Sequence, residues 1–383
     1  MKYRKIITLA ACFAMGLCWF TGCSNKDGSS ENNSSSDKKD EQVMEMRDIS
    51  AKELVSEMKI GWNLGNTLDA SGAEGIAAET AWGNPKTRED MIKLLKDTGF
   101  NVLRIPVTWN GHMDENYNVE PEWMARVKEV VDYGINNDMF VILNTHHEEW
   151  YYPDSENKDE DIKQLKTLWE QIAEEFKGYD EHLIFEGLNE PRLRNTAMEW
   201  TGGTPEAQNI INEYEQAFYD TVRNSGGNNG KRHLMITGYA ASSQSSSLQA
   251  IKIPENDNKI IISVHGYLPY SFALDTKGTD KFDANSDAVS IDSLLLNLDS
   301  MFLSQDIPVI IGEFGCVNKD NLKDRIECTK YYLSAAKSFG VPCIWWDNGS
   351  FVGNGENFGL MDRQAPAEWK TPELVNAMIE CVK

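Results

Sequence analysis

Basic residues are scarce in this chain. It has 37 lysines and arginines against 60 aspartates and glutamates, which gives 383 residues a formal net charge of −23. Three of the basic residues and no acidic one fall in residues 1–22, so the remaining chain is more acidic still. Nucleic acids and anionic membrane surfaces attract positive charge, and this balance therefore argues against either as a ligand.

Cysteines are few and lack the spacing of a disulfide or metal crosslink. Three of the seven lie within the first 23 residues, and the others are Cys316, Cys328, Cys343 and Cys381. No close pair occurs among these four, which argues against a zinc knuckle or a disulfide framework.

Long apolar runs are also missing. The apolar segment near the start of the chain, residues 6–20, is short for a membrane-spanning helix. It follows the basic residues Lys2, Arg4 and Lys5, and this order is typical of a secretory signal. Residues 20–23, FTGC, resemble the cleavage and lipidation site of bacterial lipoproteins, with Phe20 as a departure from the usual small aliphatic residue. We therefore predict a signal peptide over 1–22, lipidation of Cys23, a flexible Ser/Asn-rich tether over 23–45 and one domain over 46–383. The protein is expected to be exported, either anchored to a bacterial membrane only through Cys23 or secreted.

Within that domain, apolar β-rich runs alternate with amphipathic segments. Strands are expected at residues 59–64, 101–107, 139–145, 182–188, 232–238, 259–266, 308–314 and 341–347. Helices are expected between them, for example at 87–99, with Thr87 capping the start and Gly99 the end, and at 121–138, with an apolar face at Met124, Val127, Val130 and Val131. Eight strand–helix units predict an α/β fold, a (β/α)8 TIM barrel forming a single catalytic domain.

Polar and aromatic residues gather at the C-terminal ends of these strands, where barrel enzymes build their active sites. Seven of the eight strands contribute, with Asn63, Arg104, His146, His147, Asn189, Glu190, His265, Tyr267, Glu313, Trp345, Trp346 and Asp347 as the main candidates. Adjacent strand residues point to opposite faces, so His146 and His147 are not expected to share a metal, and neither a metal nor a cofactor is predicted.

Two of these residues, Glu190 and Glu313, are carboxylates that end apolar strands. A charge at the edge of a core needs a partner or a purpose. Salt bridges to Arg104 or Arg192 would satisfy them structurally, but paired carboxylates across a barrel mouth can also hydrolyse a glycosidic bond. The neighbouring aromatic and amide residues favour the second interpretation.

The ordered motifs GWNLGNTLDA, RIPVTW, NTHHE, GLNEPR, SVHGYLPYSF, IGEFG and IWWDNGSF resemble glycoside hydrolase family 5, most closely subfamily 4, which contains endoglucanases, mixed-linkage glucanases and xyloglucanases. The resemblance covers about residues 46–383 and implies a retaining mechanism with Glu190 as acid/base and Glu313 as nucleophile. Glu190 would then need a raised pKa, while Arg104 and Tyr267 would keep Glu313 ionised.

The same resemblance implies the sugar contacts. Asn189 would bind the 2-hydroxyl in subsite −1, His146 the same sugar, and Trp346 would stack beneath it, while His265 would tune Glu190. Further substrate-binding candidates are Asn63, Arg104, His147 and Tyr267, although His147, like Trp345, is also expected to face the barrel layers. The loops at 67–85, 147–161 and 191–209, with residues next to them, offer possible platforms at Trp82, Trp109, Trp150, Tyr151 and Trp200. Trp123 and Trp169 lie in expected helices and are assigned to core or surface packing instead.

The sequence therefore predicts an endo-β-1,4-glucanase acting on a polysaccharide. Xyloglucan or mixed-linkage glucan is the main alternative substrate, with mannan or xylan a weaker one, and a non-catalytic glycan-binding lipoprotein is the alternative of another class. A monomer is expected.

Overall fold

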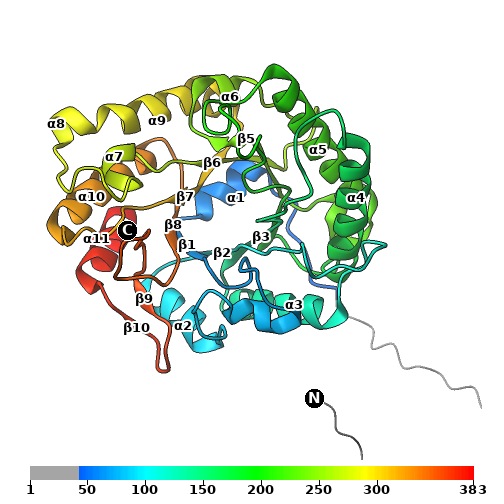
Figure 1. The fold of residues 1–383 in the computed structure, drawn as a ribbon, viewed down its shortest axis with the longest axis horizontal. Coiled ribbons are helices and arrows are strands. Elements are labelled where there is room, and N and C mark those ends of the chain that lie inside the picture. Colours follow the sequence, from blue (N-terminus) through cyan, green and yellow to red (C-terminus); the bar gives the residue numbers. More distant parts are fainter. Residues whose placement is uncertain (1–42) are drawn as a thin grey trace, which may run out of the picture. The chain divides into compact units, whose positions relative to one another are not determined.

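The computed structural model describes residues 43–383, which form a closed barrel of eight parallel strands in the order β1 to β8 (Figure 1). The predicted fold is therefore confirmed. The predicted signal peptide, the lipidation site Cys23 and most of the tether lie outside the described residues. No helix between residues 43 and 383 is long and apolar enough to cross a membrane.

Each predicted strand is present, and each pairs in parallel with its sequence neighbour, with β1 and β8 closing the ring. The strands are β1 Ile60–Leu64, β2 Val102–Ile105, β3 Phe140–Asn144, β4 Leu183–Glu186, β5 Leu234–Ser242, β6 Ile260–His265, β7 Val309–Phe314 and β8 Cys343–Asp347. A small antiparallel pair, β9 Met361–Asp362 and β10 Glu368–Trp369, follows them.

Helices surround the barrel, and those between consecutive strands form the crossover connections (Figure 1). They are α1 Ala51–Glu57, α2 Glu89–Thr98, α3 Pro121–Ile135, α4 Lys158–Glu175, α5 Pro205–Asn224, α6 Ser245–Gln249, α7 Tyr270–Ala273, α8 Ala284–Asp287, α9 Val289–Met301, α10 Leu322–Ser338 and α11 Pro372–Val382, with 3-10 turns η1 Gly75–Thr80, η2 Gly227–Gly230 and η3 Leu303–Gln305.

The local signals in the sequence explain some helix ends better than others. The predicted apolar face of α3 is buried throughout. Gly99 ends α2 with φ 118°, a left-handed conformation that suits glycine, as predicted. The expected cap at Thr87 is wrong, because α2 begins two residues later and its N-cap position, Arg88, makes no side-chain cap.

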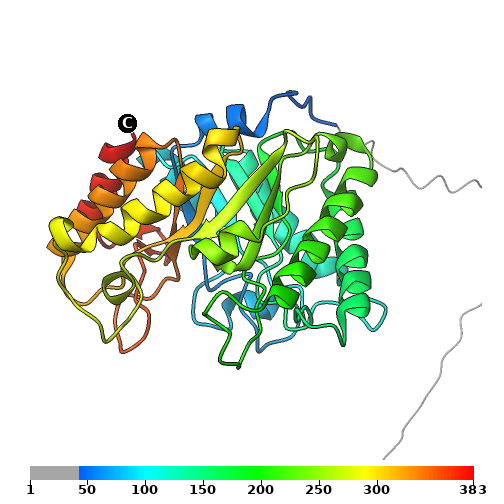
Figure 2. The same cartoon turned by 90° about the horizontal axis from the view of Figure 1, so that it is seen from above.

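The barrel interior is apolar at the N-terminal ends of the strands. Helix α1 lies across this end, as Figures 1 and 2 both show, and packs Leu54 and Val55 against inward-facing strand residues. Those strand residues form one cluster: Val102, Phe140, Ile142, Ile184, Met235, Ile261, Ile310 and Ile344. Helix α1 is held by a capping box at Ser50 and Glu53, so the helix forms a fixed plug.

A polar layer of side chains follows the apolar one toward the C-terminal ends of the strands. Strand side chains alternate between the two faces, so every second residue faces the barrel interior. Residues two positions beyond the apolar layer, such as Arg104 after Val102 and Glu186 after Ile184, face the same interior. Their partners from other strands include Asn63, Asn144 and Ser263, and all are buried. The change from apolar to polar side chains within the barrel is what positions the candidate site.

Candidate active site

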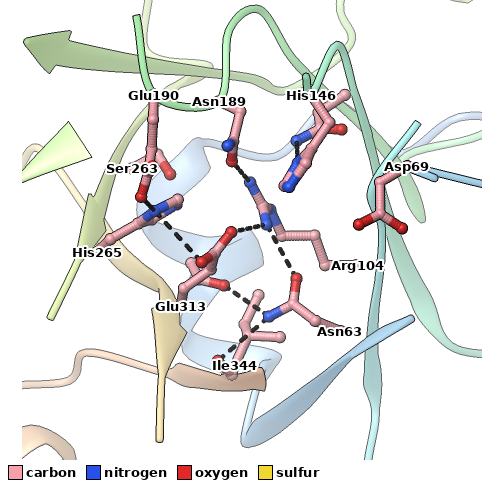
Figure 3. Close-up of polar contacts among 12 residues, drawn as sticks. Asn63, Asp69, Arg104, His146, Asn189, Glu190, Ser263, His265, Glu313 and Ile344 are labelled. Carbon is pink, nitrogen blue, oxygen red and sulfur yellow. Dashed lines mark hydrogen bonds and ion pairs between the residues drawn. The ribbon is translucent and has the colours of Figure 1, made fainter. Parts of the chain in front are cut away.

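The predicted site residues meet at the C-terminal ends of the strands (Figure 3). Five strands, β1, β2, β4, β6 and β7, supply these residues from their last positions or from the residues just after them. The residues are Asn63, Arg104, Asn189, Glu190, His265 and Glu313. Hydrogen bonds join them into two groups, one centred on Arg104 and one formed by Glu190 and His265.

Arg104 holds four neighbours with one guanidinium group. Its Nη1 donates to Glu313 Oε1 at 2.8 Å and to Asn63 Oδ1 at 2.9 Å, and its Nη2 donates to Asn189 Oδ1 at 2.7 Å. The remaining donor, Nε, reaches Glu186 Oε2 at 2.7 Å. The planar fork of arginine is suited to fixing several acceptors at once.

Arg104 and Asn63 do not lie where they could touch a substrate, which corrects their assignment as sugar contacts. Both side chains are 0% exposed. The amide nitrogen of Asn63 donates to the Gly312 carbonyl at 2.9 Å, so both ends of that amide are occupied by protein. These two residues support the site from below, and the predicted bond from Arg104 to Glu313 is present.

Sequence reasoning missed Glu186, which lies four residues before Glu190. Glu186 is fully buried and accepts hydrogen bonds from Arg104, from Ser263 Oγ at 2.6 Å and from Asn144 Nδ2 at 3.2 Å. A glutamate inside an apolar strand, two residues after the inward-facing Ile184, was the available signal. The carboxylate of Glu186 balances the charge of Arg104 inside the barrel.

Glu190 lies against a histidine. Its Oε1 is 2.7 Å from His265 Nδ1, and Arg192 donates to its backbone carbonyl at 3.0 Å. Burial raises the pKa of Glu190, but the hydrogen bond and charge of His265, with the charge of Arg192, outweigh it and lower that pKa below its ordinary value. The expected raised pKa is therefore wrong for the free protein, because a cation and not an apolar wall faces the carboxylate.

The proton of this pair is held mainly by the histidine. Burial lowers the pKa of His265, but the negative charges of Glu313 and Glu190 outweigh burial and raise that pKa overall. Its other ring nitrogen, Nε2, is buried without a hydrogen-bond partner among the described residues. Nδ1, which lies 2.7 Å from Glu190 Oε1, is therefore the ring nitrogen whose proton Glu190 can accept.

Glu313 is fixed from two sides. Tyr267 donates its hydroxyl to Oε2 at 2.8 Å, and Arg104 donates to Oε1 at the same distance. Carboxylate oxygens of Glu190 and Glu313 lie within 4.8 Å of each other, and His265 Nδ1 lies 2.7 Å from Glu190 Oε1 and 3.6 Å from Glu313 Oε2. Both predicted partners of Glu313 are thus in place.

His146 and Trp346 form one wall of the site. Their rings are parallel, with centroids 5.7 Å apart. Asn144 Nδ2 lies 3.1 Å from His146 Nδ1, and because Asn144 Oδ1 already accepts from the backbone of Val107, the histidine proton belongs on Nε2. Burial and nearby positive charges lower the pKa of His146 well below its ordinary value, so the ring is neutral. Beneath the indole, a Cβ on Gly65 would lie 2.9 Å from the ring of Trp346, so only glycine allows this approach.

The prediction that His147 faces the barrel layers is wrong, because β3 ends at Asn144 and the chain has turned. The side chain of His147 is 47% exposed and lies beside Trp82, with ring centroids 5.7 Å apart. Donor atoms of Asp69, His146 and His147 lie within 4.8 Å of one another, so the two histidines do face one space. Asp69 already accepts backbone hydrogen bonds from Asn66 and Thr67. Trp345, by contrast, is buried as expected.

Only some of the expected aromatic platforms are exposed. Trp82 and Trp200 are 43% and 57% exposed, and Trp150 is half-buried. Trp109 and Tyr151 are buried, which corrects their assignment as platforms: Trp109 donates to the Asn144 carbonyl and Tyr151 to the His146 carbonyl. As predicted, Trp123 and Trp169 lie in the core.

Comparison with known proteins identifies the family. Residues 68–352 match the family model described as cellulase, glycosyl hydrolase family 5. The chain belongs to glycosyl hydrolase family 5. It is 59% identical over 330 residues to endoglucanase B of Ruminococcus albus, an alignment covering 85% of this chain and 80% of that protein.

Solved structures of this family agree. A subfamily 4 broad-specificity endoglucanase from Ruminococcus champanellensis with bound cellotriose has a TM-score of 0.85 and 46% identity, covering 88% of this chain and all of that one. A family 5 lichenase from Caldicellulosiruptor sp. F32 has a TM-score of 0.83 and 42% identity, covering 89% and 98%. These similarities confirm the resemblance to family 5, subfamily 4.

Proposed function

We propose that this family 5 chain is a retaining endo-β-1,4-glucanase, with Glu190 and Glu313 as its catalytic pair. The observation that carries the proposal is their spacing at the barrel mouth. Oxygens within 4.8 Å suit the pair of a retaining enzyme, whose carboxyl groups are about 5–5.5 Å apart, whereas inversion needs about 6.5–9.5 Å. The names of the relatives support the same activity.

Glu313 is the nucleophile in this mechanism. The bonds from Arg104 and Tyr267 aim its carboxylate and favour its ionised form. Attack on the anomeric carbon forms a glycosyl-enzyme ester and breaks the bond to the leaving sugar. Water then cleaves the ester and retains the configuration.

Glu190 protonates the leaving oxygen and later activates the water. His265 keeps the necessary proton 2.7 Å away and returns it to Glu190 when the glycosidic oxygen approaches. The 2.7 Å contact between Glu190 Oε1 and His265 Nδ1 supports this role, because a proton can pass directly between the two groups.

The sugar in subsite −1 is bound by three side chains. Arg104 occupies the oxygen of the Asn189 amide, which leaves its nitrogen to donate to the 2-hydroxyl. Neutral His146 offers its Nε2–H to the same sugar, and Trp346 provides an apolar face. The contact to the 2-hydroxyl strengthens in the oxocarbenium-like transition state.

Two exposed tryptophans, Trp82 and Trp200, contact residues that lie next to the catalytic pair or to His146. Arg192 stacks on Trp200 at 4.4 Å and also contacts Glu190, so Trp200 lies on the leaving-group side of the scissile bond. Trp82 and His147 lie at the other wall, beyond His146. Mixed-linkage glucan is the second candidate substrate, because one similar structure is a lichenase and another has broad specificity; xyloglucan remains a prediction from the sequence.

Glu313→Gln tests this function directly. Wild type should release reducing ends from soluble β-1,4-glucan, and the variant should release fewer by a factor on the order of 10³ or more, because Gln cannot form the ester. Equal release by the two proteins would refute the enzyme and favour a glycan-binding lipoprotein. Binding of cello-oligosaccharide to Glu313→Gln checks that the groove is intact.

Export and lipid anchoring through Cys23 are also proposed, on the sequence of residues 1–45 alone. Cys23→Ser should move the protein from the membrane fraction to the soluble exported fraction. Retention of the variant in the membrane fraction would contradict the anchor.

A further inference from the structure

We propose that Arg192 is a positioning residue for the acid/base Glu190, fixing the carboxylate oxygen that His265 does not contact. This inference rests on the proposed function and adds to it a residue outside the barrel strands. Arg192 lies two positions after Glu190, in the loop of residues 187–204 that joins β4 to α5.

The two oxygens of the Glu190 carboxylate have different partners. His265 Nδ1 lies 2.7 Å from Oε1, and Arg192 Nη1 lies 3.5 Å from Oε2. The same arginine nitrogen donates to the backbone carbonyl of Glu190 at 3.0 Å. Arg192 therefore contacts the main chain and the side chain of Glu190 at once. With a contact on each oxygen, the carboxylate cannot turn without losing one of them.

Arg192 is itself held by two further side chains. Its Nε donates to Glu199 Oε1 at 3.1 Å, and Glu199 Oε2 accepts from the Asn195 amide at 2.8 Å. Its guanidinium group stacks on the indole of Trp200 at 4.4 Å. The side chains of Arg192 and Glu199 are only 22% and 21% exposed, so their ion pair is partly shielded from water. A planar guanidinium can make these contacts together, whereas a lysine ammonium cannot.

The loop that carries Arg192 is fixed to β5. The Tyr239 hydroxyl accepts a hydrogen bond from the Leu193 amide and donates one to the Met198 carbonyl, both at 3.0 Å. Gly203, with φ 73°, lies so close to the same tyrosine that an added Cβ would be 2.3 Å from its ring. Arg192 therefore contacts Glu190 from a loop that is held in place on both sides.

The proposed mechanism needs the ionised form of Glu190 in both of its steps. The proton of Glu190 passes to the glycosidic oxygen while the bond to the anomeric carbon breaks, which leaves a carboxylate. That carboxylate then takes a proton from the water that attacks the ester. The Arg192 cation beside Oε2 stabilises the carboxylate at the end of the first step and at the start of the second.

The charge of Arg192 also bears on the pH at which the Glu190–His265 pair loses its proton. Arg192 is one of the cations that lower the pKa of Glu190, so its removal should let the pair keep the proton to higher pH. The basic limb of the kcat/KM profile should then move to higher pH. Other charged or titratable groups that act on the pair stay in place: Arg104 on β2, His146 and His147 after β3, Glu199 in the same loop, Tyr267 after β6, Glu313 on β7 and Glu356 after β8.

Arg192→Met removes the charge and the donors while keeping an unbranched side chain. On soluble β-1,4-glucan, kcat/KM should fall about 10- to 100-fold, the range for a lost contact to a charged group. On a nitrophenyl β-cellobioside the loss should be less than about threefold, because a nitrophenolate departs without a proton. The basic limb should move up by about one pH unit. A residue that only stabilised the fold would lower both activities by the same factor and leave the basic limb unchanged.

Two further variants separate charge from geometry. Arg192→Lys keeps the cation but cannot hold Glu199 and both groups of Glu190, so part of the loss on glucan should persist while the basic limb stays at its wild-type pH. Lys93→Gln on α2, where Lys93 is 63% exposed and pairs with Asp97, is the matched control for a lost cation. The control should match wild type on both substrates and in its pH profile.

Glu199→Gln provides a second route to the same result if Arg192→Met has a lowered melting temperature. It keeps Arg192 and its charge but weakens the ion pair that orients the guanidinium, so the loss on glucan should again exceed the loss on the nitrophenyl substrate. Equal fractional losses on both substrates, with an unshifted basic limb in Arg192→Met, would overturn the inference. In that case glucan hydrolysis by wild type would leave the proposed function standing, whereas an inactive wild type would refute the function itself.

Discussion

The two ends of this barrel use the same eight strands for opposite purposes. At the N-terminal end, α1 and a ring of aliphatic side chains form an apolar plug. At the C-terminal end, the next inward-facing positions hold Arg104, Glu186, Asn144 and Ser263 in one hydrogen-bonded network. The change takes place within two residues on strands β2 and β4.

The difference teaches which part of the fold provides stability and which provides chemistry. Burying aliphatic side chains yields roughly 1.5–3 kcal/mol for each one, so the plug stabilises the barrel. A buried charge network contributes little net stability, because desolvation offsets the attraction. The charge network instead fixes the positions of Glu313 and Asn189, which both accept hydrogen bonds from Arg104.

Arg104→Lys should have the largest effect at the polar end. The single ammonium cannot serve the four acceptors that the guanidinium holds, so kcat/KM on soluble glucan should fall by a factor on the order of 10² to 10³, as when a positioning contact is lost by about 1 Å. Steady-state kinetics measures the loss. A variant with more than a tenth of wild-type kcat/KM would show that Arg104 does not position the pair.

The matched variant at the apolar end is Leu54→Ala in α1, a fully buried residue of the plug. It should lower the free energy of unfolding by about 2–5 kcal/mol and leave kcat/KM of the folded enzyme unchanged. Urea denaturation and kinetics on the same preparation check both statements. A tenfold loss of kcat/KM here would mean that the two ends are coupled, against the comparison.

The sequence predicted the apolar N-terminal end of the barrel poorly and the polar C-terminal end well. Strand number, order and the meeting of Glu190 with Glu313 followed from repeated apolar runs ending in polar residues. The closing of the barrel by α1 was not anticipated, because a seven-residue helix carries little periodic signal. Glu186 was missed because a charged residue within an apolar run reads as part of the strand unless its facing partner is known.

Other errors arose where the chain leaves a strand. The faces of His146 and His147 were assigned from strand alternation, which fails after β3 ends at Asn144. Trp109 and Tyr151 were assigned from loop position, whereas hydrogen bonds from their polar atoms draw them inward. The pKa of Glu190 depended on the orientation of His265, which comes from a strand 75 residues away in sequence.

Two buried titratable residues give the ends opposite pH dependence. Near the polar end, burial raises the pKa of Glu148 to about 7, although it accepts hydrogen bonds from Trp109 and Trp150. At the apolar end, burial lowers the pKa of His233 to about 4; its Nε2 bonds to the Ile49 carbonyl, and its Nδ1 has no partner among the described residues. Folded Glu148 therefore binds its proton more tightly than unfolded glutamate, and folded His233 binds its proton less tightly.

The signs follow from proton linkage. Between about pH 4.5 and 7 the Glu148 contribution to stability falls as pH rises, while between about pH 4 and 6.5 the His233 contribution increases, so the two largely cancel in wild type. Glu148→Gln should therefore make the free energy of unfolding rise more steeply with pH than in wild type, and His233→Gln should make it fall, each by about 2 kcal/mol between pH 5 and 7. Urea denaturation at pH 5, 6 and 7 measures these slopes, and differences within each variant remove any fixed cost of the substitution. Equal pH dependence of the free energy of unfolding in all three proteins would show that Glu148 is not held protonated and His233 is not held neutral by the fold. Opposite changes in the two variants would show that the polar end loses stability as pH rises and the apolar end loses stability as pH falls.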